Sequence, residues 1–231
     1  MRLGRYDNPY KCVSYRSIDA AVRQEPVLLE ASDGGLSHGI LYSQGHPRTV
    51  VCFMHPKADN SRWMNNDELC VHENLLLDVA AGVRFLRQRG FEKIVVCGNS
   101  GGGSLYAFYI AQSVTTPPQR LTQTPAGDYL DLNVHDLPAV DGYINLAAHL
   151  GEGKILMMMI DPSVTDENDP LSCDPSLDPF RPENGYRQPP DSSQYAPEFV
   201  ERYRAAQRTR VARIDAIARD FLQQRNEARG S

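Results

Sequence analysis

The first hydrophobic positions along the chain fall into short runs. Two apolar runs, residues 27–29 and 39–42, flank a turn signal at residues 33–35. This arrangement predicts an antiparallel hairpin. Residues 49–54 follow as an apolar, β-branched run without alternation. Such a run is typical of a strand that is buried on both faces.

The apolar period then becomes helical over residues 65–89, where apolar side chains recur three and four positions apart and Gly90 follows as a natural helix end. Residues 93–97 predict a second buried strand, and the glycine-rich run 98–103 comes directly after it. A further helix is expected to about Ser113.

Residues 140–148 predict a third strand. Strands that alternate with helices indicate an α/β fold, with a mostly parallel sheet and helices on both faces. The hairpin is expected to form the leading edge of this sheet. We expect residues 1–160 to be the core domain.

The composition changes after residue 160. Residues 161–197 contain eight prolines and eight acidic residues, so no regular element is expected there. From Pro197 an apolar stripe at helical spacing predicts a long helix with arginines on its polar face. Residues 161–231 are therefore interpreted as a proline-rich segment followed by a helical cap.

The overall composition excludes several classes of function. The net charge is −5, which argues against nucleic-acid binding. The apolar runs are too short to span a membrane, and residues 1–12 lack the apolar core of a signal peptide. Five scattered cysteines show no zinc spacing. The sequence thus predicts a cytoplasmic protein without a metal or an organic cofactor.

One motif points to chemistry. Gly98-Asn99-Ser100-Gly101-Gly102 joins a predicted strand to a predicted helix. This is the context of a nucleophile elbow, in which a sharp turn exposes a serine hydroxyl at the carboxyl edge of a sheet. A glycine-rich turn that only packs is the alternative interpretation.

Two phosphate-binding motifs compete for the same glycines. A P-loop requires lysine where this chain has Ser104, and a dinucleotide fingerprint requires glycine or alanine where it has Tyr106. Each alternative therefore fails at one specific position.

Together with residues 49–55 and the helix that ends at Gly90, this motif resembles the core of the α/β-hydrolase superfamily. Residues 61–67, 98–105 and 161–167 resemble a bacterial serine hydrolase branch of it. The resemblance covers most of the chain from residue 25 onward.

The resemblance implies a role for each residue of the site. Ser100 is the implied nucleophile, and Gly98 and Gly102 are the elbow glycines. The N–H groups of Gly101 and Lys57 are the implied oxyanion donors. Lys57 is preferred to its neighbour because a proline, at position 56, has no N–H.

The chain departs from the family pattern in two places. The acid and the histidine of a triad follow the nucleophile in this superfamily, but only His135 and His149 follow Ser100 here. No strand is predicted after residue 160 to carry them. The segment after His55 is also too short for the helix and strand that the family inserts there. The alternative to a serine hydrolase is therefore an inactive or truncated homologue.

These interpretations imply different partners. A serine hydrolase takes a small-molecule acyl substrate such as a carboxylic ester. An incomplete sheet favours association, so a homodimer is a possible assembly. The arginines of the last helix either form a solvated face or bind an acidic partner, which includes the chain's own residues 161–197.

Overall fold

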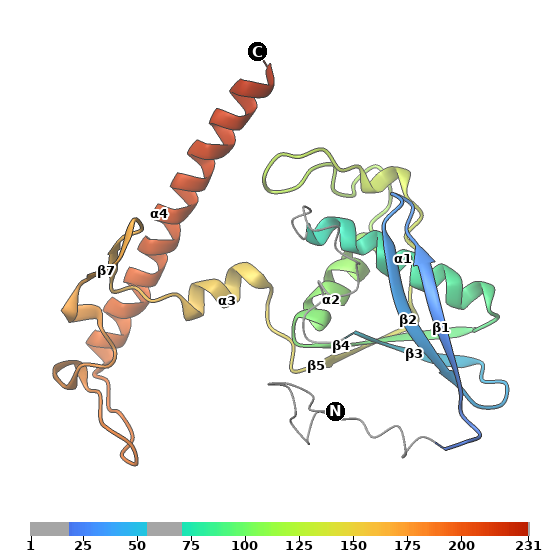
Figure 1. The fold of residues 1–231 in the computed structure, drawn as a ribbon, viewed down its shortest axis with the longest axis horizontal. Helices are drawn as coiled ribbons and strands as arrows, with labels where there is room; N and C mark the ends of the chain where they lie inside the picture. Colours follow the sequence, from blue (N-terminus) through green and yellow to red (C-terminus); the bar gives the residue numbers. More distant parts are fainter. Residues whose placement is uncertain (1–18, 55–70, 231) are drawn as a thin grey trace, which may run out of the picture. The chain divides into compact units, whose positions relative to one another are not determined.

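The computed structural model describes residues 19–54 and 71–230 of the chain. The chain forms two compact units, Met1–Ala148 and His149–Ser231, and Figure 1 shows their elements. The contacts thus place the boundary between residues 148 and 149, whereas the composition suggests a boundary after residue 160. Residues 149–160 therefore belong to the second unit.

The first unit contains a three-stranded parallel sheet with strand order β3-β4-β5. Its strands are β3 (Thr49–Met54), β4 (Lys93–Asn99) and β5 (Gly142–Leu146). The connections between them contain helices α1 (His72–Gln88) and α2 (Gly101–Val114) and a short 3-10 helix, η3 (Leu132–Val134). The predicted alternation of strands and helices and the α/β class are confirmed.

Both helices of this unit lie on one face of the sheet (Figure 1). The Tyr106 hydroxyl on α2 donates to Cys52 Sγ on β3 at 3.2 Å, which places α2 on the side of Cys52. The alternate side chains Val51 and Phe53 point the other way and are 55% and 59% exposed. Right-handed crossovers that add strands in one direction put their helices on the same face. Within the described residues, the expectation of helices on both faces is therefore wrong.

The predicted hairpin is present but does not extend the sheet. Strands β1 (Arg23–Glu30) and β2 (Leu36–Ser43) pair only with each other as an antiparallel sheet. A cavity of about 490 Å³ lies between β2 and β3. Because this cavity separates the hairpin from β3, the hairpin is not the leading edge of the parallel sheet, and that expectation is corrected.

An apolar core holds the first unit together. It is built mainly from α1, α2 and β4, and its most deeply buried members include Leu75, Leu76, Ile94, Val96 and Tyr109. The apolar side chains that the sequence predicts on one side of α1 face this core, as expected of an amphipathic helix. The core therefore fixes the end of β4 and the start of α2, where the candidate site lies.

The second unit contains regular structure that the proline content argued against. A helix, α3 (Glu152–Met159), precedes a two-stranded antiparallel sheet of β6 (Val164–Asp166) and β7 (Asp169–Cys173). Two 3-10 helices, η4 (Pro175–Leu177) and η5 (Pro182–Asn184), follow. Each of these begins with its proline, where no N–H is needed. The expectation of no regular element in residues 161–197 is thus wrong.

The long terminal helix is confirmed as α4 (Pro197–Gly230). Its arginines bind the acidic segment before it. Glu167, in the turn between β6 and β7, accepts hydrogen bonds from Arg210 at 2.9 Å and from Arg213 at 2.6 Å. The Arg210 hydrogen bond is the main reason that the pKa of Glu167 falls to about 2, and Arg213 lowers it further. Part of the arginine-rich face therefore binds within the second unit. We call the ion-pair cluster of Glu167, Arg210 and Arg213 the anchor.

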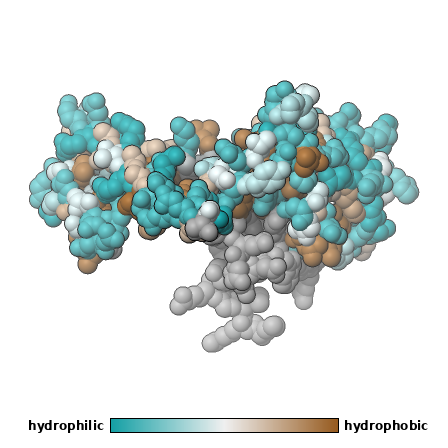
Figure 2. Space-filling view, turned by 90° about the horizontal axis from the view of Figure 1, so that it is seen from above, coloured by the Kyte–Doolittle hydropathy of each residue, from teal (hydrophilic) through white to brown (hydrophobic). Residues whose placement is uncertain are grey.

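Hydrophilic side chains cover most of the surface of each unit that is visible in Figure 2, and hydrophobic ones are interspersed among them. In the described part of the chain, every helix is too short or too polar to cross a lipid bilayer.

Candidate active site

The candidate site is built around the turn from β4 into α2. Ser100 sits between Asn99, the last residue of β4, and Gly101, the first residue of α2, with φ 52° and ψ −120°. A positive φ is rare for a residue with a Cβ and costs roughly 1–3 kcal/mol. The turn is held from both sides, because Ser100 N donates to Leu146 O and Gly103 N donates to Ser100 O, both at 3.0 Å.

The glycines around Ser100 allow two backbone segments to touch. A Cβ on Gly98 would lie 2.5 Å from the backbone of Gly102 and Gly103. A Cβ on Gly103 would lie 2.4 Å from the Ala148 side chain and 2.9 Å from Gly98 O. These distances are shorter than any ordinary van der Waals contact, so no larger residue fits at either position without a backbone shift. The first turn of α2 thus packs directly against the end of β4.

The N-terminus of α2 places the backbone N–H of Gly101 next to the serine. Gly101 is buried and opens the helix, so its N–H has no acceptor within the helix. The Ser100 side chain does not cap α2, and the first turn holds no acidic residue. The partial positive charge of the helix end is therefore not neutralised by its own side chains.

Contacts from β5 support this turn. The Tyr143 hydroxyl donates to Gly103 O at 2.8 Å. Ala148 N donates to Asn145 Oδ1 at 3.1 Å, and this brings the Ala148 methyl group against Gly103. Sequence reasoning found Ser100, Gly98, Gly101 and Gly102, but it missed these supports. Gly103 was visible as part of the glycine run, whereas nothing local marks Tyr143, which lies forty positions further along.

The second predicted oxyanion donor, Lys57, lies outside the described residues, as does His55. The role of Lys57 as an oxyanion donor therefore stays a prediction from the resemblance.

The two histidines that follow Ser100 are engaged elsewhere. His135 Nδ1 lies 2.8 Å from Ser32 Oγ in the turn of the β1–β2 hairpin. His149 Nδ1 accepts from Gly151 N at 3.1 Å, and His149 belongs to the second unit.

Asp141, a carboxylate with a lowered pKa in the first unit, has a structural task. Asp141 accepts from the backbone N of Ile94, from Lys93 and from Arg87, at 2.9, 2.9 and 2.6 Å. The Ile94 hydrogen bond is the first of these causes of its lowered pKa. Ile94 lies near the start of β4, and Ser100 follows its other end. Asp141 therefore links the start of β5 to the start of β4. It does not orient a general base at the turn around Ser100.

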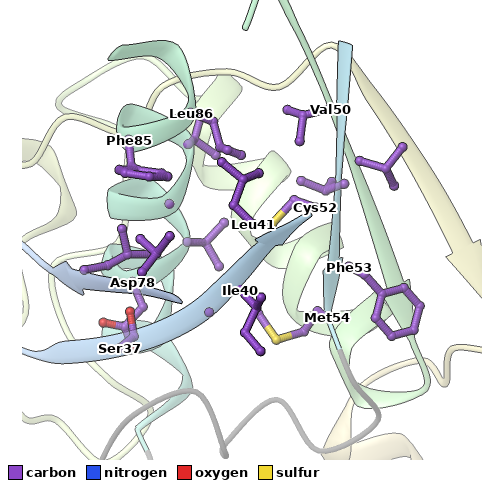
Figure 3. A pocket seen from close by; sticks show the side chains of 18 of the residues that line it. Ser37, Ile40, Leu41, Val50, Cys52, Phe53, Met54, Asp78, Phe85 and Leu86 are labelled. Carbon is purple, nitrogen blue, oxygen red and sulfur yellow. The ribbon is translucent and has the colours of Figure 1, made fainter. Parts of the chain in front are cut away.

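The cavity between β2 and β3 is a separate feature of the first unit. Consecutive residues of both strands line it, and α1 supplies much of the remaining wall. Figure 3 shows mostly apolar side chains, with Ser37 and Asp78 together at one end. Both polar side chains are buried. Ser100 is not among the lining residues, so the cavity is not the space around the candidate nucleophile.

The described residues contain no group of three or more histidine, cysteine, aspartate or glutamate side chains that could hold a metal ion. Burial raises the pKa of the Cys52 thiol, and the hydrogen bond from Tyr106 only partly opposes this effect. Cys52 is therefore a neutral core thiol rather than a reactive thiolate.

The sequence matches no protein-family model and no curated protein. Among solved structures, the chain is similar to two crystal forms of the esterase Pf2001 from Pyrococcus furiosus. One is 18% identical with a TM-score of 0.33, over 40% of this chain and 48% of the esterase chain. The other is 15% identical with a TM-score of 0.32, over 44% and 47%. The chain thus spans about half the length of the structures that it matches.

Proposed function

We propose that the chain is a serine hydrolase of carboxylic esters or related acyl compounds, with Ser100 as the nucleophile. The observation that carries the proposal is the backbone of Ser100, a non-glycine residue at φ 52° between a buried strand and a helix. A serine could start this helix without such strain, and strain of this kind clusters at functional sites. The turn presents the hydroxyl at the carboxyl edge of the sheet.

In the proposed reaction Ser100 Oγ attacks the ester carbonyl carbon and forms a tetrahedral intermediate. The Gly101 N–H and the positive end of α2 stabilise the resulting oxyanion, and the N–H of Lys57 is the second proposed donor. Collapse expels the alcohol and leaves an acyl-serine, which water hydrolyses to the acid. A general base must take the serine proton, and the proposal leaves this role to a group other than His135.

A second candidate function is supported by the same region. His135 hydrogen-bonds to Ser32 and Arg120, and His149 accepts from Gly151 N. A serine hydroxyl without a base is a weak nucleophile. The alternative is thus a hydrolase homologue that keeps the elbow but lacks a complete triad.

Turnover of a short aryl ester tests the proposal. The wild type and Ser104→Ala, a matched serine change one turn further along α2, should hydrolyse p-nitrophenyl acetate at similar rates. Ser100→Ala should lose at least about a hundredfold in kcat, because only binding and oxyanion stabilisation remain. Equal rates in all three proteins would contradict a role for Ser100, and no turnover by a folded wild type would favour the inactive homologue.

A further inference from the structure

The C-terminal half of α4 extends beyond the rest of the second unit (Figure 1). Arg213 still binds that unit, through Val164 O at 2.9 Å and through Glu167. Beyond it the helix continues for about 25 Å. In this part Arg219 donates to Asp215 and Gln224 donates to Asp220, so these bonds lie within the helix itself.

This half of α4 exposes an apolar stripe to solvent. Ile214, Ile217 and Phe221 follow one another at spacings of three and four, so they lie on one face. Ile217 is 41% exposed and Phe221 is 64% exposed. A helical segment of this length is marginal in water without packing. The stripe therefore has the form of a contact surface for another helix.

The charges beside the stripe indicate which helix fits. Spacings of three and four define the a and d positions of a heptad, with Ile214 and Phe221 at a and Ile217 at d. Asp220 then occupies a g position and Arg225 the following e position. In a parallel pair of identical helices, each g residue faces the next e residue of the partner. Asp220 of one copy would meet Arg225 of the other, twice by symmetry.

The opposite orientation is disfavoured by the same charges. In an antiparallel pair that aligns Ile217 with Phe221, Asp220 faces Asp220 of the other copy. In these registers the two flanks of this helix attract each other in the parallel pair and repel each other in the antiparallel pair.

We propose that residues 214–230 of α4 pair with the same residues of a second copy as a short parallel coiled coil. Gln224 occupies a d position, and a polar residue there lowers stability while it selects a register. The assembly is therefore a dimer that forms reversibly and depends on concentration. This proposal is independent of any activity of Ser100.

Sedimentation of the full chain over a concentration series tests the pairing. The wild type should shift from monomer to dimer as its concentration rises. Asp220→Arg places a second arginine opposite Arg225 and should weaken association at least about tenfold. The double variant D220R/R225D exchanges the two charges and should restore association. Phe221→Ala should weaken it by removing the most exposed apolar side chain of the stripe.

Asp215→Arg is the matched control, because it reverses a charge on the same helix away from the stripe. It should leave the dimerisation constant within about twofold of the wild type. Circular dichroism checks that each variant keeps its helix content. A wild type that remains monomeric, or a dimer that D220R does not weaken, would overturn the proposal. A double variant that stays as weak as D220R would overturn the parallel arrangement.

Discussion

The first unit buries Leu76 and Ile94 completely, whereas the second unit buries an amide, Gln207, with 1% exposure. Gln207 Nε2 donates to Met158 O at 3.1 Å and to Ile160 O at 2.9 Å. The first unit is thus stabilised mainly by apolar packing, whereas the second combines the buried Val164 and Phe199 with directed hydrogen bonds and ion pairs from α4. The two units should therefore respond to different mutations and to different solution conditions.

Substitutions in the apolar core of the first unit should be the most destabilising. Leu76→Ala removes a side chain with no solvent exposure and should destabilise that unit by about 3 kcal/mol, because the transfer and cavity costs add. Hydrogen exchange followed by mass spectrometry reads the two units separately. Amides of α1, α2 and β4 should lose protection, and those of α4 should not. Equal losses in both units would contradict independent stabilisation.

The next effect concerns the turn at the candidate site. Gly98→Ala places a Cβ 2.5 Å from the backbone of Gly102 and Gly103, and overpacking of this kind costs roughly 1–3 kcal/mol. Gly82→Ala is the control, since its Cβ would meet only the Leu29 side chain at 3.8 Å. That change should stabilise α1 by up to about 1 kcal/mol. Denaturant unfolding measures both, and a neutral Gly98→Ala would show that the close approach is not required.

A smaller effect is expected at the anchor of the second unit. Glu167→Gln removes the charge that both arginines bind and should cost about 1–2 kcal/mol in that unit alone. Its carboxylate is 18% exposed, so the loss is larger than for a surface pair. Glu183→Gln, an exposed change in the same proline-rich segment, should stay within about 0.5 kcal/mol of the wild type. Protection of β6, β7 and α4 by hydrogen exchange reports the difference.

The smallest effect is a pH dependence of the same anchor. The folded pKa of Glu167 is about 2, below the value of roughly 4.3 expected in the unfolded chain. The stabilisation is therefore fully present above the unfolded pKa, and it is lost as the pH falls toward 2. The gap in stability between the wild type and Glu167→Gln should narrow steadily below about pH 5. A gap that is constant from pH 6 to pH 3 would contradict the ionised anchor.

Sequence periodicity recovered the elements of the first unit because their cores are apolar. β4 and α1 show the pattern of the faces that they bury. The expectation that residues 49–54 are buried on both faces is wrong within the described residues, because Val51 and Phe53 on one face of β3 are more than half exposed. The absence of hydrogen bonding between the hairpin and β3 could not be foreseen, since alternation within a strand does not identify its neighbours. The position of both helices on one face depends on the strand order, which local patterns also do not contain.

The second unit was less predictable because its elements depend on contacts between distant side chains. α3 was missed, since residues 155–160 are apolar throughout and show no period. β6 and β7 were missed because Glu167, which holds their turn, is bound by arginines more than forty residues away. At the candidate site, the glycine run predicted the turn at Ser100, whereas the support from Tyr143 arises only from the parallel pairing of β4 and β5.

The most direct test of the proposed nucleophile is labelling with a fluorophosphonate probe, read by intact mass and by peptide mapping. We expect one adduct on Ser100, present in the wild type and in Ser104→Ala and absent in Ser100→Ala. The reaction requires an activated serine and does not depend on knowing the natural substrate. A folded wild type that stays unlabelled, or an adduct that persists in Ser100→Ala, would contradict the assignment of Ser100 as an activated nucleophile.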